Sequence, residues 1–202
     1  MNTLEAIELR RSVKAFDPTH ELTAEEERTL FEHAILSPTS FNMQNWRFVV
    51  VKDKGLRQQI REAGFGQAQL TDASLLIVLT ADLKAWAKDP QRYWKDAPEP
   101  VRDAMVSMMG PFYEGNEQLE RDEAMRSIGI AAQTLMLAAR ALGYDSCPMI
   151  GFDAGRIAEI IQLPEDHVIG MIVVIGKRLK DPQPRGGQLN LDEVVIVDRF
   201  ER

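Results

Sequence analysis

A basic segment near the N-terminus carries the clearest chemical signal in the sequence. Cations and a hydroxyl group gather within a few positions of a chain whose formal net charge is -7: Arg10, Arg11, Ser12 and Lys14. Guanidinium groups donate paired hydrogen bonds to a phosphate, and an ammonium group adds a point charge. Basic residues near a helix C-terminus are also favoured by the helix dipole alone. The segment therefore indicates either a phosphate site or an ordinary helix end.

A second segment is dense in small hydrogen-bonding side chains and leads into an apolar run that begins at Phe48. It contains Ser37, Pro38, Thr39, Ser40, Phe41, Asn42, Gln44 and Asn45. Such side chains often do no more than stabilise a turn by bonding to the local backbone. The alternative is a loop whose hydroxyl and amide groups meet the polar edge of a ligand.

A third segment runs from Cys147 to Asp153. Gly151 permits close approach of the backbone to a ligand, and Asp153 is expected to cap a helix over residues 154–161. By itself this pattern indicates only a turn between a strand and a helix. Cys147 is the only cysteine, and a small buried apolar role is favoured over that of a nucleophile.

Several familiar sites are missing from the sequence. There is no G-x-G-x-x-G motif, because Gly64-Phe65-Gly66 lacks the third glycine, and there is no phosphate-loop or G-x-S-x-G motif. The three histidines, His20, His33 and His167, lack the spacing of metal ligands. We therefore expect no resident metal and no tightly held Rossmann dinucleotide.

The overall composition is that of an ordinary globular protein. With 202 residues, 45% of them hydrophobic, the chain is expected to form one domain, residues 1–202, with a real core. The negative charge argues against nucleic acid or an anionic membrane as a partner. A single cysteine and an N-terminus unlike a signal peptide favour a reducing compartment, so we expect a cytoplasmic protein.

The hydrophobic pattern predicts a small set of elements around these segments. Thr23 and Glu26 form a capping box for a helix that runs to about residue 36. A short helix is predicted over residues 56–63, and buried strands over residues 48–51, 75–79, 169–175 and 194–197.

For two further regions the sequence does not decide what they pack against. A helix predicted over residues 123–142, closed by Gly143, is apolar nearly all round, so it lies either in the core or against a second subunit. Residues 84–119 are rich in proline and aromatic side chains and are expected to form an insertion of short helices. Such an insertion either covers a ligand site or packs only on itself.

Taken in order, these segments resemble the nitroreductase family of FMN flavoproteins. Residues 10–16 are similar to the family's N-terminal phosphate motif, and residues 37–46 to its second flavin motif. Residues 65–74, the long apolar helix, residues 148–153 and Pro184-Arg185 follow in the family's order. The resemblance spans about the whole chain and rests on the joint order of the motifs.

The resemblance implies an α+β, nitroreductase-like fold: a mostly antiparallel sheet wrapped by helices, with a C-terminal strand that extends onto the partner of a homodimer. It implies that FMN binds at the subunit interface. The implied contacts are Arg10, Arg11, Ser12, Lys14 and Arg185 at the phosphate and ribityl chain; Pro38, Thr39, Ser40 and Asn42 from the other subunit; Gln69 at the polar edge of the ring; and Pro148, Met149, Ile150 and Gly151 on one ring face.

The implied activity is ping-pong hydride transfer from NAD(P)H, through FMN, to nitroaromatic, quinone or similar flat electron-poor acceptors. The flavin carries the chemistry, so no catalytic acid or base is expected from the protein. Aromatic side chains would stack on substrates: Phe41, Trp94, Phe112 and Tyr113. One alternative is an enzyme of the same family with another acceptor, such as an enone or a flavin. A second is a flavin-binding storage or sensing protein without useful turnover, and a third is a structural or adaptor protein.

Three positions depart from the family's pattern. Asn45 stands where proline is common, Ile150 stands where one branch has an acidic residue, and residues 186–188 lack the basic side chains that are frequent there. These departures weaken any transfer of substrate preference.

Overall fold

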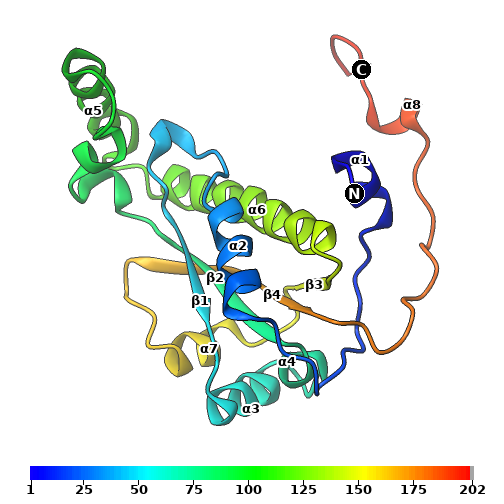
Figure 1. Cartoon of the computed structure of the whole chain (residues 1–202). Helices are drawn as coiled ribbons and strands as arrows, with labels where there is room; N and C mark the ends of the chain where they lie inside the picture. Colours follow the sequence, from blue (N-terminus) through cyan, green and yellow to red (C-terminus); the bar gives the residue numbers. More distant parts are fainter. Residues whose placement is uncertain (201–202) are drawn as a thin grey trace.

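A four-stranded antiparallel sheet, with strand order β1-β2-β4-β3, organises the molecule (Figure 1). Its strands are β1 (Trp46–Val50), β2 (Leu75–Asp82), β3 (Asp145–Met149) and β4 (His167–Gly176). The computed structural model describes residues 1–200. Every residue of β2 is buried, as expected for a central strand that is covered on both faces.

Helices lie on both sides of this sheet. They are α1 (Thr3–Leu9), α2 (Ala24–Ala34), α3 (Lys54–Ala63), α4 (Gln69–Asp72), α5 (Glu99–Tyr113), α6 (Glu117–Ala141), α7 (Ala154–Ile160) and α8 (Leu191–Val194), with 3-10 turns at Ser40–Asn42, Ala85–Ala87 and Pro90–Trp94. None of the helices in residues 1–200 combines the length and apolar character needed to cross a bilayer.

Alternation along the central strands divides the core between the two faces. Ile77 and Val173 pack with residues of α2 and α6, whereas Leu76 and Val174 pack with residues of α3 and α7. Successive side chains of a strand point to opposite faces, so one apolar run serves two layers. In Figure 1 the long helix α6 crosses one face of the sheet, while α3 and α7 lie on the other side.

Most predicted elements are present with shifted ends. The capping box of Thr23 and Glu26 begins α2, which ends at Ala34 rather than near residue 36. The long helix α6 begins at Glu117, six positions before the predicted start, and Gly143 follows it with a left-handed φ of 87°. Strands β1, β2 and β4 lie at the first three predicted ranges, and α3 and α7 match the predicted short helices.

The predicted strand over residues 194–197 does not form within the single chain. Residues Leu191–Val194 form α8, and no strand follows it within residues 1–200. A strand needs a neighbouring strand to pair with, and this tail leaves the sheet (Figure 1). The fourth strand is instead β3, outside the predicted ranges. Pro148 obscures its pattern but is tolerated because β3 lies at a sheet edge.

Candidate cofactor site

The basic segment is held in place by backbone pairing rather than by a helix. Helix α1 ends at Leu9, and the extended chain then runs beside β3, where Ser12 pairs with Ser146 in a parallel bridge. Val13 and Phe16 point into the core and are essentially unexposed. Ser12 and Lys14, on either side of Val13, are exposed on the outer side, as a phosphate site requires.

A cavity of about 500 Å³ opens between this segment and the chain that follows β4. Five cations line it and only one acid: Arg10, Arg11, Lys14, Lys180 and Arg185, with Asp181. Arg185 donates to the carbonyl oxygens of Glu8 and Arg10, at 3.1 and 2.9 Å, and Arg11 donates to the carbonyl of Gln183. The structure thus brings Arg185 to the N-terminal cluster, where the family resemblance placed it.

One donor in this cavity has no protein partner. Arg10 Nε is buried and makes no hydrogen bond within residues 1–200. A buried guanidinium N–H without an acceptor costs free energy, and an anionic ligand would satisfy it. The residues present therefore fit a phosphate group. Arg10 is the C-cap of α1, where the helix dipole favours a cation, but the dipole does not account for Lys180 and Arg185 in the same cavity.

The segment after β3 lies beside the basic cluster. Burial raises the pKa of the Cys147 thiol, although the positive charges of Lys14 and Arg10 act to lower it. Cys147 is buried, which agrees with a packing role. Met149 is buried, whereas Ile150 is 79% exposed and Gly151 is exposed. This end of β3 therefore presents one large apolar side chain outward.

A pair of glutamines ties the end of β3 to the loop before α4. Gln67 Nε2 donates to the Gly151 carbonyl at 2.9 Å, and Gln69 Nε2 donates to Gln67 Oε1 at 3.1 Å. Asp153 N also donates to the Ala63 carbonyl at 2.9 Å. Gln69 is therefore placed close to residues 148–151. No role was predicted for Gln67, although this residue adjoins the turn at Gly66.

The polar loop at residues 37–45 lies elsewhere in the chain. Ser40 N donates to the Glu123 carboxylate of α6, and Thr39 Oγ1 accepts from Gln44 N at 2.9 Å. Phe41 and Asn42 have left-handed φ values of 50° and 53°, a strained backbone for residues other than glycine. Within residues 1–200 no hydrogen bond joins this loop to the basic cavity or to residues 148–151.

Three polar atoms of this loop region are buried without a partner in residues 1–200. They are Ser37 Oγ, Asn45 Oδ1 and Trp46 Nε1. Buried polar groups in folded proteins are nearly always paired, so the single chain leaves this region unusually unsatisfied. Asn45, one of the departures from the family's pattern, is among them.

The four predicted substrate aromatics form one cluster. The rings of Phe41 and Phe112 lie 5.5 Å apart, and those of Phe112 and Tyr113 lie 4.9 Å apart. Trp94 Nε1 donates to the Phe41 carbonyl at 3.0 Å. Phe112 is 50% exposed, whereas Tyr113 is completely buried. Only part of the cluster therefore has a ring surface free to meet a ligand.

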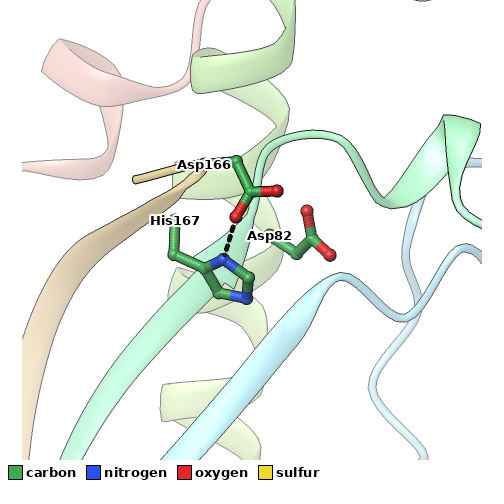
Figure 2. A group of neighbouring side chains, drawn as sticks. All are labelled: Asp82, Asp166 and His167. Carbon is green, nitrogen blue, oxygen red and sulfur yellow. Dashed lines mark hydrogen bonds and ion pairs between the residues drawn. The ribbon is translucent and has the colours of Figure 1, made fainter. Parts of the chain in front are cut away.

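A group of acidic and imidazole side chains stands apart from these segments. Asp82, Asp166 and His167 place one ligand atom each within 4.8 Å of one another (Figure 2). The Lys88 ammonium group already contacts both carboxylates, at 2.8 Å from Asp82 and 2.5 Å from Asp166. Burial lowers the pKa of Lys88, but the hydrogen bonds to Asp166 and Asp82 outweigh it and raise the net value. Lys88 thus supplies the positive charge in this group.

Comparison with known proteins agrees with this arrangement. The nitroreductase family profile matches residues 7–177. The chain belongs to the nitroreductase family. The DrgA protein of Synechocystis sp. is 60% identical over 181 residues, which cover 90% of this chain and 86% of the relative. MhqN of Bacillus subtilis, named an NAD(P)H nitroreductase, is 32% identical, with coverage of 92% and 94%.

A solved nitroreductase structure supports the fold directly. The protein from Exiguobacterium sibiricum, determined in complex with FMN, superposes with a TM-score of 0.90 at 29% identity, covering 97% of each chain. The α+β nitroreductase fold with its antiparallel sheet is therefore confirmed. Lys180 in the cavity was not predicted, although it lies only five residues before Arg185.

Proposed function

We propose that this chain is an FMN-dependent oxidoreductase that passes a hydride from NAD(P)H to flat, electron-poor acceptors such as nitroaromatics and quinones. The carrying observation is the cationic cavity in which Arg10 Nε is buried without a partner. When bound, FMN would supply the hydride chemistry in two half-reactions. The names of MhqN and of the Exiguobacterium sibiricum protein support this assignment.

The first task of the protein is to hold the phosphate end of FMN. Arg10, Arg11, Lys14 and Arg185 would supply charge, and Ser12 a hydroxyl donor. Lys180, which lines the same cavity, adds a further cation. This addition offsets the missing basic side chains at residues 186–188. Arg185 is itself fixed by two backbone carbonyls, so its position is set before a ligand arrives.

The second task is to orient the ring. Gln69 would meet its polar edge, and Pro148, Met149, Ile150 and Gly151 would lie against one face. The Gln67 bridge to Gly151 supports this placement, because it fixes the loop before α4 relative to the end of β3. Ile150 is exposed and offers an apolar surface at the position where one branch of the family has a charged, acidic residue.

The third task falls to a second subunit. Pro38, Thr39, Ser40 and Asn42 would complete the partner's site, and the buried, unpartnered Ser37 Oγ and Asn45 Oδ1 support an interface there. The tail would add its strand to the partner's sheet. Strand β1 is an edge strand, and an apolar groove of about 300 Å³ beside it is lined by Phe31, Trp46, Arg47, Phe48 and Val50.

The insertion at residues 84–119 packs on the polar loop and would therefore shape access to the open ring face of the partner's site. Phe41 and Phe112 offer ring surface to flat acceptors, and Trp94 fixes Phe41 through its carbonyl. Tyr113, being buried, would support Phe112 from behind. No side chain is assigned to move a proton.

Purification and turnover test the proposal. The protein should be yellow, and heat should release FMN rather than FAD, because the cavity suits a terminal phosphate. NAD(P)H oxidation should accelerate when a quinone is added. A colourless protein that also fails to take up added FMN would refute the proposal. FMN binding without acceptor-dependent turnover would favour the storage or sensing alternative.

A further inference from the structure

The insertion at residues 84–119 is anchored at both ends by buried carboxylates. Asp82 lies at the end of β2 and Glu120 in the first turn of α6, and each is only 4% exposed. A buried charge is costly unless it is paired and hydrogen-bonded. The partners of these two carboxylates therefore have a strong effect on where the insertion sits.

At the first anchor, one carboxylate organises the start of the insertion. Asp82 Oδ1 accepts from the backbone N–H of Lys84 at 2.9 Å, and Asp82 Oδ2 accepts from Lys88 Nζ at 2.8 Å. Lys88 Nζ also lies 2.5 Å from Asp166 Oδ2, just before β4. Lys88 thus links the insertion to the ends of two neighbouring central strands.

At the second anchor, Glu120 binds the same stretch from the other side. Lys84 Nζ donates to both of its carboxylate oxygens, at 2.8 and 2.6 Å, and Trp86 Nε1 donates to Oε1 at 2.7 Å. The entry and the exit of the insertion are therefore tied together across residues 84–120.

From these anchors a continuous set of contacts reaches the polar loop. The Tyr93 hydroxyl donates to the Ala85 carbonyl at 3.1 Å, and Asn42 Nδ2 donates to the Tyr93 carbonyl at 2.7 Å. Trp94 Nε1 donates to the Phe41 carbonyl. The two residues of the loop that the insertion contacts, Phe41 and Asn42, have strained left-handed backbones, as does Gln44 in the same loop. Such strain persists only where the surroundings hold it.

We propose that Lys84 and Lys88 are positioning residues for the acceptor end of the site. Paired with Glu120 and Asp82, they hold the insertion, and the insertion holds Phe41, Asn42 and Phe112 in the geometry that an acceptor meets. The inference rests on the proposed function for its link to acceptors, whereas the mechanical coupling from Lys88 to Phe41 stands on the contacts alone.

The test compares Lys88→Met with Lys88→Arg, which keeps the charge. Lys52→Met is the matched control, because Lys52 also pairs with a carboxylate, Glu27, but lies outside the insertion. Amide hydrogen exchange of residues 38–44 and 85–94 is measured together with FMN content and with KM for menadione and for ferricyanide. Ferricyanide is a small inorganic acceptor that needs no aromatic surface.

In Lys88→Met we expect exchange in residues 38–44 to accelerate about tenfold. We expect KM for menadione to rise about threefold to tenfold, with the ferricyanide rate per bound FMN kept. Lys88→Arg should restore both values, and Lys52→Met should change neither.

Unchanged exchange at residues 38–44 would overturn the coupling from Lys88 to Phe41. A lowered melting temperature with an unchanged ratio of KM for menadione to KM for ferricyanide would mean that Lys88 has only a structural role. A wild-type protein without FMN would refute the proposed function instead, while the exchange measurement would still test the coupling. If Lys88→Met fails to fold, Trp94→Phe breaks the contact to Phe41 without removing a charge, and the same exchange result is expected.

Discussion

At the scale of single residues, unsatisfied groups separate a ligand site from an ordinary surface. Arginine and lysine side chains on a surface are solvated and need no partner. Arg10 differs because its Nε is buried in a cavity lined by four other cations. Such a concentration of positive charge destabilises the free protein, and an anion would relieve both the repulsion and the missing hydrogen bond.

The Arg10 donor gives a quantitative prediction. Charge-assisted hydrogen bonds are worth roughly 1.5–3 kcal/mol, so Arg10→Ala should weaken FMN binding by about one to two decades. Arg10→Lys keeps the charge but loses the planar donors, and an intermediate loss is expected. Quenching of flavin fluorescence on binding measures the affinity. Arg28→Ala, which removes only an exposed pair with Glu32, should leave the affinity unchanged.

Tyr144 gives a prediction on pH. Burial, followed by the 2.7 Å hydrogen bond to Glu26, raises the pKa of Tyr144 to about 12. The folded state favours the neutral phenol, so this stabilisation is complete below the ordinary pKa of 10.0 and is lost as the pH rises through about 12. Burial also raises the pKa of Tyr113, so phenolate absorbance should show more than one tyrosine titrating late, and Tyr144→Phe should remove one tyrosine's share of that step. A Tyr144 that titrates near 10.0 would contradict the structure.

At the scale of elements, the sequence predicted what local pattern controls. The capping box at Thr23 and Glu26 and the apolar runs of β2 and β4 are local, and each predicted element formed there. Strand β3 was missed because Pro148 and the polar Asp145 and Ser146 hide an edge strand whose pairing partner, β4, is distant in sequence.

The cofactor site was predicted in its composition but not in its connections. Arg185 was placed with Arg10 by resemblance alone, since no local pattern joins residues so distant in sequence. The carboxylate anchors at Asp82 and Glu120 were not predicted at all. Their partners Lys88 and Lys84 look like ordinary surface lysines until the fold brings β2, β4 and α6 together.

The contact between α6 and β4 gives a prediction on packing. Gly170 is the extra residue of a bulge in β4, and a Cβ added there would lie 2.7 Å from two side-chain carbons of Ile128. Gly170→Ala should therefore cost about 1–3 kcal/mol, because Ile128 is buried and has little room to move. Thermal unfolding measures the loss. The double variant with Ile128→Ala should lose less than the sum of the single losses, and strict additivity would contradict this contact.

At the scale of the whole molecule, the single chain leaves apolar surface exposed. The described tail carries large exposed side chains that contact no core: Leu189, Leu191, Val194, Val195, Ile196, Val197 and Phe200. Helix α1 also exposes Leu4 and Ile7 while packing against α6. Contiguous exposed apolar surface of this kind marks an interaction site. Helix α6 was predicted to lie either in the core or against a second subunit. Ile128 and Leu135 lie in the core, whereas Ile130 is 43% exposed and remains available for a contact with a second subunit.

The tail therefore provides the decisive test of assembly. In the proposed dimer, Val195 and Val197 leave water and pack beside the partner's β1, near the groove formed by Phe31 and Phe48. Val195→Asp combined with Val197→Asp would place two charges at that contact, and each would be costly to bury. We expect the double variant to shift from dimer to monomer at micromolar concentration, as measured by light scattering.

The same variant should lose FMN as it dissociates, because Thr39, Ser40 and Asn42 are proposed to complete the partner's site. Leu56→Asp on α3 is the matched control, since it adds a charge at an exposed apolar position away from the tail. The control should remain a yellow dimer. If the double variant also remains a dimer with full flavin content, the tail does not pack on the partner. If it becomes a monomer that keeps its flavin, the basic cavity of one chain binds FMN without the polar loop of another.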